Sequence, residues 1–350
     1  LERLGVRLGG LLGFVLGDSV AVHTEPADFA DEYSEPRGAA SADVDCVCLL
    51  SGGLDSLAGA VALLENGRKP LLLSHETGNP VTRSSREHVR KCLSARYGPV
   101  ESASVHLNAS GRREPRWPFP DERHQEPTRR CRSFVPLAAA AALAHGLGLQ
   151  EVWIPENGVM AAQLPLTRAR VGSFTTRTTH PRWLRGLEGL FSDCLGETIH
   201  IINPLLGMTK AEAVGDLILP HLSEDAVRGT DSCWAVGRQA VPCGGCVPCI
   251  VRRLTFARCG LAPEAAASDP LSDPSGQPRT EGRRNVTAIL SLVRDFALLD
   301  DDRLRLRYPE LAYVEPEQDT TVAVLRRFAL EVAKVCRREY PEAGRLLGLE

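Results

Sequence analysis

A short glycine-containing stretch near residue 50 combines residue types that can bind phosphate. It follows an apolar run, precedes a helix-like pattern, and consists of Ser51, Gly52, Gly53, Leu54, Asp55 and Ser56. Adjacent glycines let consecutive backbone N–H groups converge on an anion, and the helix that follows adds the positive end of its dipole. The two serine hydroxyls can donate further hydrogen bonds to phosphate oxygens. The stretch therefore predicts a phosphate-binding loop.

The same loop has no lysine, which separates it from the Walker A type. It therefore does not indicate transfer of a γ-phosphate. A carboxylate at Asp55 would repel phosphate unless it caps the helix or shares a Mg²⁺ ion with a bound nucleotide. The competing interpretation is an ordinary strand-to-helix turn in which Asp55 is the N-cap.

Four regularly spaced cysteines form a second group that could do chemistry. They follow the pattern C-x9-C-x2-C-x2-C, at Cys233, Cys243, Cys246 and Cys249. Four thiolates can close a tetrahedral set around Zn²⁺, which leaves no position for water and predicts a structural role. An iron–sulfur cluster, a disulfide and a catalytic cysteine pair are the alternatives. The other seven cysteines are expected to be small buried apolar residues.

The elements that must position these groups alternate along the chain as apolar runs and helical patterns. The runs are nearly continuous in Leu, Val and Ile, as in strands buried on both faces, at 44–50, 70–74, 100–107, 151–154 and 199–202. Helical patterns that end near a glycine lie at 56–65, 84–97 and 134–145. A capping box at 209–212 opens another helix. This alternation predicts an α/β fold whose parallel sheet is covered by helices.

The remaining segments complete the predicted organisation. We expect an N-terminal extension (1–43) that adds an edge hairpin or a partner contact, a nucleotide-binding domain (44–225), the cysteine segment (226–262), a linker (263–284) and a helical C-terminal region (285–350). Residues 111–128 and 155–182 show no clear periodicity and predict long functional loops. Within the last region, a helix is predicted at 322–336.

The composition excludes several classes of protein. The net charge is −3 and the pI is about 6.4, so no basic excess exists for binding nucleic acid. The apolar run at 8–16 is shorter than the roughly 20 residues of a membrane span. Eleven cysteines, four of them clustered, suit a cytosolic metal site better than a disulfide framework. We therefore expect a cytoplasmic protein that binds neither membranes nor nucleic acid.

The string from Ser51 to Ser56 resembles the PP-loop of the ATP pyrophosphatase superfamily. This resemblance implies an adenine-nucleotide α-hydrolase-like fold, with ATP and Mg²⁺ as cofactors. It also implies that the loop holds the β,γ-pyrophosphate while an acceptor attacks the α-phosphate, with Asp55 and Ser56 in the catalytic site. Such enzymes activate a carboxylate or carbonyl as an adenylate for ammonia, an amine or sulfur.

The cysteine segment, from Thr230 to Arg253, is similar to the zinc site of 7-cyano-7-deazaguanine synthases. With the loop, the resemblance spans residues 46–260. It implies a small-molecule substrate, 7-carboxy-7-deazaguanine, whose carboxylate is adenylated, converted to an amide by ammonia and then dehydrated to a nitrile.

Three further residues are carried over from this resemblance. Arg132, which precedes an alanine-rich helix, matches an arginine of that family, and the match implies a contact with a phosphate or with the adenylate. Lys210, in a Thr-Lys-x-Glu segment, implies a contact with the α-phosphate. His75 follows the second strand, where the superfamily recognises adenine. For Arg132 and Lys210 the alternative is an ordinary surface side chain.

Residues 155–182 depart from the housekeeping synthases. Their elements Glu156-Asn157-Gly158 and Thr178-Thr179-His180-Pro181 resemble divergent synthase-like proteins of anti-phage clusters, such as the Qat system and type IV CBASS. A carboxylate and an amide match the edge of a purine, so Glu156, Asn157 and Gly158 are predicted to bind substrate. Arg177 and His180 are predicted to orient a carboxylate or phosphate. A subunit-contact loop is the alternative.

This departure leaves the acceptor open between ammonia and a protein amine. The predicted partners are a protein acceptor or other subunits of a defence cluster, and a second copy of the chain. Another PP-loop amidotransferase, a tRNA-modifying enzyme and a nucleotide-binding scaffold are the alternative functions.

Overall fold

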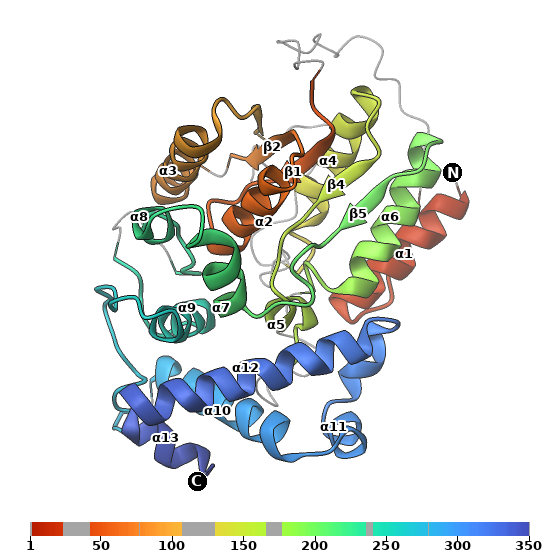
Figure 1. The fold of residues 1–350 in the computed structure, drawn as a ribbon. Helices are drawn as coiled ribbons and strands as arrows, with labels where there is room; N and C mark the ends of the chain where they lie inside the picture. The colour runs from red at the N-terminus through yellow and green to blue at the C-terminus, as the bar shows by residue number, and fades with distance from the viewer. Residues whose placement is uncertain are drawn as a thin grey trace.

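A five-stranded parallel sheet lies at the centre of the upper part of the molecule (Figure 1). The computed structural model describes residues 2–23, 43–76, 78–106, 130–165, 177–235, 241–278 and 280–349. The strand order is β3-β2-β1-β4-β5, with bounds Cys46–Leu49 (β1), Pro70–His75 (β2), Ser102–Val105 (β3), Glu151–Trp153 (β4) and His200–Ile202 (β5). All neighbours pair in parallel. The five predicted strands are confirmed.

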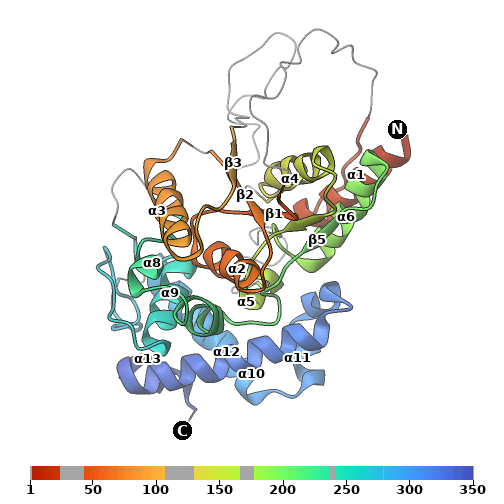
Figure 2. The ribbon, with the colours of Figure 1, turned by 45° about the horizontal axis from the view of Figure 1, so that its top comes forward.

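Helices cover both faces of this sheet (Figure 2). Cys46 and Cys48 of β1 pack into an apolar cluster with α2 (Leu54–Glu65) and α3 (Pro80–Tyr97). Val47 points to the opposite face, where α4 (Phe134–Gly146), α6 (Pro181–Leu195) and α1 (Glu2–Leu16) pack. Because successive strand residues face opposite sides and both sides are covered, the strand sequence is apolar throughout.

Residues 2–16 of the N-terminal segment form a helix and not an edge hairpin, and residues 24–42 lie outside the described residues. The helix α1 lies along α6, and Arg7 forms an ion pair with Asp193. The residues of α1 that pack into the apolar cluster with α6 include Leu4, Leu8, Leu11, Leu12 and Val15. They recur at intervals of three or four positions, which places them on one face of the helix. Neither α1 nor any other helix in the described residues is long and apolar enough to cross a bilayer.

Two segments predicted to be irregular contain ordered structure. The segment 155–182 includes α5 (Gly158–Ala162) and the start of α6, although 166–176 lie outside the described residues. The expected linker at 263–284 buries Leu271 in the C-terminal core, and α10 (Glu281–Leu298) begins within it. The predicted loop at 111–128 lies outside the described residues.

The C-terminal helices share a separate apolar core at the bottom of Figure 1. This core joins α9 (Val247–Arg258) and α10 to α11 (Asp301–Arg307), the 3₁₀ segment η4 (Pro309–Val314), α12 (Gln318–Glu339) and α13 (Pro341–Leu347). Above α12 lie α7 (Lys210–Glu212), the π-helical turn η3 (Ala213–Ile218) and α8 (Glu224–Arg228). The parallel sheet, its flanking helices and this helical region confirm the predicted α/β class.

The cysteines outside the cluster are not all buried. Cys46, Cys48 and Cys336 are buried, whereas Cys194 is exposed on α6. The prediction of burial is therefore wrong at Cys194, which lies in the last turn of α6.

Replacing Gly59 of α2 by alanine should destabilise the fold, because the added Cβ would overlap the ring of Pro155. We expect the free energy of unfolding to fall by about 1–3 kcal/mol, the usual cost of overpacking, in urea titrations followed by circular dichroism. Gly10→Ala is the matched control, since Gly10 is also helical and no atom lies within 4 Å of its added Cβ. Equal effects of the two substitutions would contradict this packing.

Candidate functional site

The glycine loop lies at the carboxyl end of β1, where α2 begins. Gly52 has a φ of +87°, and an added Cβ there would lie 2.9 Å from Cγ of Arg86. Gly53 is the N-cap of α2, and no side chain caps this helix end. The first N–H groups of α2 are therefore open to an anion. The Ser51 and Ser56 hydroxyl oxygens lie 3.1 Å apart beside them.

Asp55 forms a buried ion pair with Lys210. Nζ of Lys210 donates to Oδ2 of Asp55, and the two side chains are only 9% and 11% exposed. Nδ2 of Asn157 donates to the same oxygen over 3.1 Å. Burial alone would raise the pKa of Asp55, but the Lys210 ammonium and the hydrogen bonds lower it overall. Asp55 is thus an ionised carboxylate and not the N-cap of a plain turn.

A second carboxyl group, Glu156, lies beside this pair in surroundings that favour its neutral form. Burial, and next the charge on Asp55, raise the pKa of Glu156 well above its usual range. Oδ1 of Asp55 is buried and has no hydrogen-bond donor among the described atoms, and a protonated Glu156 is able to donate to it. The side chain of Asn203 holds the Glu156 backbone, through bonds of 3.0 Å to its N–H and 2.8 Å to its carbonyl. Sequence reasoning missed Asn203, although it directly follows β5.

Two short helices bring Asn157 and Lys210 to Asp55. Asn157 is the N-cap of α5 and is fully buried. Lys210 is the first residue of α7, which begins with a capping box between Thr209 and Glu212. The chain contains only four lysines, at positions 69, 91, 210 and 334. A buried lysine paired with a carboxylate at the edge of a sheet is typical of a functional site.

Two of the residues carried over by resemblance lie near this group. His75 ends β2, beside the strand that leads into the loop, and its carbonyl accepts from Arg86. The charge of Arg132 acts on Glu156 and lowers the pKa of that carboxyl, against the larger effect of burial. Arg132 thus lies within electrostatic reach of Glu156.

Arg177 and His180 have different neighbours. Arg177 donates to the carbonyl of Phe14 in α1, and the His180 ring packs 5.2 Å from the Phe14 ring. His180 also caps α6 by accepting from the N–H of Arg182 over 3.2 Å. Burial, followed by the charge of Arg177, lowers the pKa of His180 to about 3, so its ring is neutral. Their described contacts join α1 to α6 and do not include Asp55.

The four cysteines converge on one point, as the zinc prediction requires. Their sulfur atoms lie within 4.8 Å of one another, and those of Cys243 and Cys249 are 3.9 Å apart. A tetrahedral set with Zn–S bonds of about 2.3 Å has sulfur atoms about 3.8 Å apart. The N–H of Cys246 donates to the Cys243 sulfur over 3.3 Å. At Gly244, φ is +73° and an added Cβ would overlap the Ser268 carbonyl. This cluster can hold a metal ion.

The cysteine segment also supports the glycine loop. The N–H of Asp231 donates to the Gly52 carbonyl over 3.1 Å. Arg252 of α9 donates to the hydroxyl of Thr230 over 2.7 Å. This bond fixes the strip that precedes the first cysteine, residues 230–232. A cavity of about 420 Å³ opens between this strip, the start of α3 and Glu264. A space of this size can accept a small ligand, and its lining includes Cys233, Cys249 and Asp231, whose N–H binds the loop.

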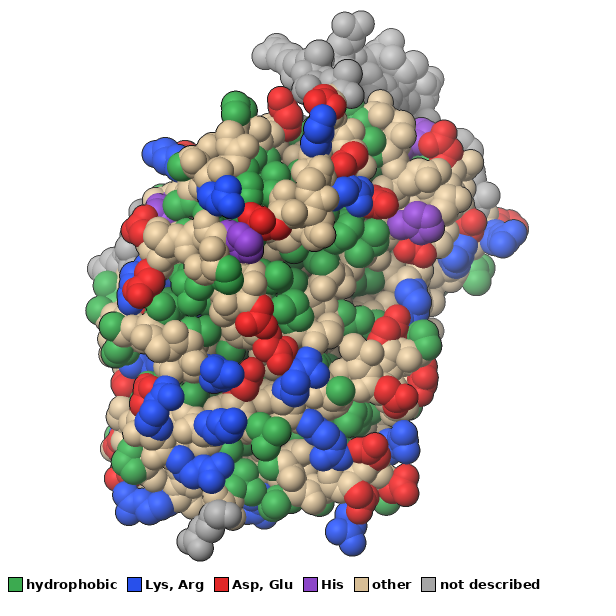
Figure 3. All heavy atoms as spheres, in the orientation of Figure 1, with side chains coloured by type: hydrophobic (Ala, Val, Ile, Leu, Met, Phe, Trp, Pro, Cys, Tyr) green, Lys and Arg blue, Asp and Glu red, His purple; other side chains and the backbone are tan. Residues whose placement is uncertain are grey.

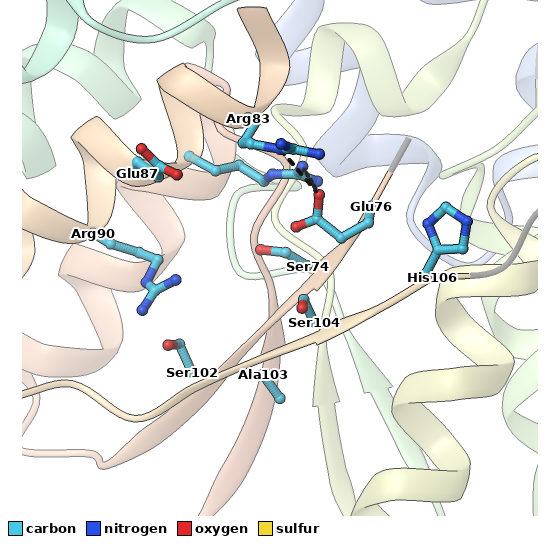
Figure 4. A pocket seen from close by; sticks show the side chains of 10 residues that line it. Ser74, Glu76, Arg83, Glu87, Arg90, Ser102, Ala103, Ser104 and His106 are labelled. Carbon is cyan, nitrogen blue, oxygen red and sulfur yellow. Dashed lines mark hydrogen bonds and ion pairs between the residues drawn. The ribbon is translucent and has the colours of Figure 1, made fainter. Parts of the chain in front are cut away.

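A second pocket lies between α3 and the edge strand β3 (Figure 4). It encloses about 330 Å³, and Figure 4 shows Glu76 pointing toward Arg83. Glu76 pairs with Arg86 over 2.8 Å and with Arg83 over 3.9 Å. Because these arginines already have a carboxylate partner, the pocket is a weaker anion site than the glycine loop.

The surface charges are mixed on the face shown in Figure 3. Basic side chains gather over the C-terminal helices at the bottom, with acidic side chains among them. Several are paired, as Arg326 is with Asp301 and Arg327 with Glu212. This face therefore offers no continuous basic surface of the kind that binds nucleic acid.

Known proteins resemble the chain over part of its length. The 7-cyano-7-deazaguanine synthase of Methanothrix thermoacetophila is 26% identical over 233 residues, which cover 61% of this chain and 95% of that protein. The 7-cyano-7-deazaguanine synthase of Desulfatibacillum aliphaticivorans is 26% identical over 227 residues, which cover 61% and 93%. No protein-family profile matches the chain. The similarity thus extends over nearly the whole of both synthases.

The purified protein should contain about one zinc ion per chain, because four thiolates can complete its coordination. Metal analysis by mass spectrometry would measure this, and Cys246→Ser should lose the ion. Cys194→Ser, at the exposed cysteine of α6, should keep it. Iron with visible absorbance, or zinc retained by Cys246→Ser, would contradict the assignment.

Replacing Lys210 by methionine should leave Asp55 buried without its counter-ion. Loss of one partner of a buried pair costs about 3–5 kcal/mol of unfolding free energy, whereas the double variant Asp55→Asn/Lys210→Met should recover much of it. Urea unfolding at pH 7 would compare them. Folding lowers the pKa of Asp55 below the value that it has in the unfolded chain. The ion pair therefore stabilises the wild type fully above the unfolded-state pKa, and this stabilisation is lost as the pH falls from there through the lowered pKa of the folded state. A double variant no more stable than Lys210→Met would contradict the pairing.

Proposed function

Because the chain is similar to 7-cyano-7-deazaguanine synthases along nearly their whole length, we propose that it is an ATP-dependent enzyme that activates a 7-deazaguanine carboxylate. The observation that carries the proposal is the buried Asp55–Lys210 pair beside the uncapped N-terminus of α2. The substrate we propose is 7-carboxy-7-deazaguanine. The first product is its acyl-adenylate, and pyrophosphate is the leaving group.

In this mechanism the glycine loop binds the β- and γ-phosphates of ATP. The open N–H groups at the start of α2 and the Ser51 and Ser56 hydroxyls donate to their oxygens. A carboxylate oxygen of the substrate then attacks the α-phosphorus. The bond from that phosphorus to the bridging oxygen breaks, and its electron pair leaves with pyrophosphate. Catalysis comes mainly from positioning and from neutralising charge.

The Asp55–Lys210 pair supplies charges of both signs at the α-phosphate. An ammonium has three N–H donors, so Lys210 can keep one on Asp55 and turn another to a phosphate oxygen. The ionised Asp55 also fits as a ligand for Mg²⁺, which when bound would neutralise charge on the leaving pyrophosphate. The raised pKa of Glu156 favours its neutral form, which adds no repulsion toward the phosphates. Arg132, within electrostatic reach, is the proposed contact for the adenylate.

The neighbouring residues are proposed to position this pair. Asn157 is fully buried and bonded to Asp55, which favours holding the carboxylate over reading a purine edge. Glu156, Gly158, Arg177 and His180 belong to the same divergent segment, 155–182. We propose that Arg177 and His180 fix this segment against α1, in agreement with their contacts to Phe14.

Two acceptors suit the activated carboxylate. Ammonia would give an amide, and a second activation with loss of water would give a nitrile, which is the cyano group in the names of both relatives. A protein amine would instead join the deazaguanine to a polypeptide, which would suit a role in anti-phage defence. The support for that second outcome is the divergence of 155–182 and the helical region after residue 281.

The wild-type protein should release pyrophosphate from ATP only when Mg²⁺ and 7-carboxy-7-deazaguanine are both present. A coupled phosphate assay after pyrophosphatase treatment would measure the rate. Asp55→Asn and Lys210→Met should each lower kcat about 100-fold or more, because a charge that acts in the transition state is lost. Lys334→Met makes the same substitution at an exposed lysine of α12 and should retain full activity.

Absence of pyrophosphate release by the wild type, or formation of ADP in its place, would contradict this function. Mass spectrometry then identifies the acceptor. A small amide or nitrile formed with ammonium indicates ammonia, and a mass increase on a polypeptide supplied as acceptor indicates a protein amine.

A further inference from the structure

The long helix α12 lies beneath both short helices that carry the partners of Asp55 (Figures 1 and 2). It packs against α5, which begins after Asn157, and it forms hydrogen bonds with the start of α7, which carries Lys210. The contact residues are Val324, Arg327 and Glu331. Their spacing of three and four places them on one face of the helix.

Glu331 holds the cap of the lysine helix. Oγ1 of Thr209 donates to Oε1 of Glu331 over 3.0 Å, and it accepts from the N–H of Glu212 over 3.1 Å. The hydroxyl is thus fixed through both its hydrogen and its oxygen. Glu331 and Lys210 also line the same small cavity of about 10 Å³. Because Thr209 directly precedes Lys210, its position sets where the lysine side chain begins.

Arg327 holds the other half of this cap. Its Nε and Nη2 atoms donate to the two carboxylate oxygens of Glu212 over 2.6 and 3.2 Å, and Nη2 also donates to the Gly207 carbonyl. Glu212 in turn accepts from the N–H of Thr209 over 2.8 Å. A lone exposed ion pair contributes little to stability. Here the guanidinium of Arg327 forms two hydrogen bonds with the Glu212 carboxylate, which the capping box already orients.

Val324 packs against Gly158, which directly follows Asn157, the second partner of Asp55. An added Cβ at Gly158 would lie 2.9 Å from Cγ1 of Val324 and would overlap the Leu206 carbonyl. The N–H of Gly158 donates to the Met208 carbonyl over 2.9 Å. The segment after Asn157 is therefore packed between α12 and the turn that leads to Lys210.

We propose that α12 sets the position of the Lys210 ammonium at the active site, and that Glu331 and Arg327 are positioning residues for the reaction. This inference rests on the proposed role of Lys210 at the α-phosphate. Neither residue touches substrate; both act through the capping box at Thr209 and Glu212.

The charge on Glu331 adds a dependence on pH. Burial, opposed by the Thr209 hydrogen bond, raises the pKa of Glu331 to about 7. The charged groups that face it are Glu212 from α7, Arg258 from α9 and Arg327 from its own helix. Lys210 lines the same small cavity, and the thiol of Cys259 also lies within electrostatic reach of Glu331. Above pH 7 the carboxylate is ionised and accepts strongly from the Thr209 hydroxyl. Below pH 7 it is neutral and holds the cap more weakly.

The first experiment does not use activity. Brief treatment with acetic anhydride followed by peptide mass spectrometry reports the exposure of each of the four lysines. Labelling of Lys210 relative to exposed Lys334 should be low in the wild type and should rise several-fold in Glu331→Ala and Arg327→Met. Arg326→Met is the matched control, because Arg326 bonds to Phe296, Leu299 and Asp301 within the C-terminal helices. It should leave Lys210 labelling unchanged.

The second experiment measures pyrophosphate release. Glu331→Ala and Arg327→Met should lower kcat about tenfold or more while KM for ATP changes little, because misplacing the lysine costs mainly transition-state binding. Arg327→Lys should restore part of the loss and Arg326→Met should match the wild type. The wild-type kcat should rise as the pH passes through about 7, and Glu331→Gln should lack that step, since its amide accepts without titrating.

The outcomes separate this inference from the proposed function. If the wild type releases no pyrophosphate, the function fails, and the labelling result still reports on the positioning of Lys210. If Lys210 labelling and kcat in the Glu331 and Arg327 variants match those of Arg326→Met, the positioning role is overturned. A pH step of equal size in Glu331→Gln would overturn the role of its charge. Urea unfolding confirms that each variant is folded.

Discussion

The buried contact between the Lys210 ammonium and the Asp55 carboxylate is the constraint on which the site depends. Removing two charges from water is costly, so such a pair needs further hydrogen bonds, and here Asp55 accepts one from Asn157. Three elements meet at this pair: α2 carries Asp55, α7 carries Lys210, and Asn157 is the N-cap of α5. Burial and the charge on Asp55 raise the pKa of Glu156 beside them, which disfavours a third charge in the cluster.

Two regions far from the glycine loop in sequence hold this arrangement in place. The strip before the cysteines bonds to Gly52 through Asp231 and is tied to α9 through Arg252 and Thr230. On the other side, α12 supports α5 and the cap of α7. Direct contacts therefore connect the cysteine segment to the glycine loop, and the C-terminal helix α12 to α5 and α7. A sequence change in either region can act on the site without touching a ligand.

The sequence allowed the sheet and the loop to be predicted because both depend on local pattern. Continuous apolar runs identify strands buried on both faces, and the capping box at Thr209 is visible as Thr-x-x-Glu. Burial of Lys210 against Asp55 was not visible, because the two lie 155 residues apart and their contact is created by the sheet order. The helix α5 has only five residues, too few for a period to show. In α1, glycines obscured a stripe with helical spacing.

The central claim is that the substrate carboxylate attacks the α-phosphorus of ATP. Carrying out the reaction with 7-carboxy-7-deazaguanine labelled with ¹⁸O in its carboxylate tests this most directly, by mass spectrometry of the AMP that is formed. The account predicts that one labelled oxygen appears in AMP once the adenylate has reacted with its acceptor. AMP that carries no label, or a labelled oxygen recovered in inorganic phosphate, would contradict it.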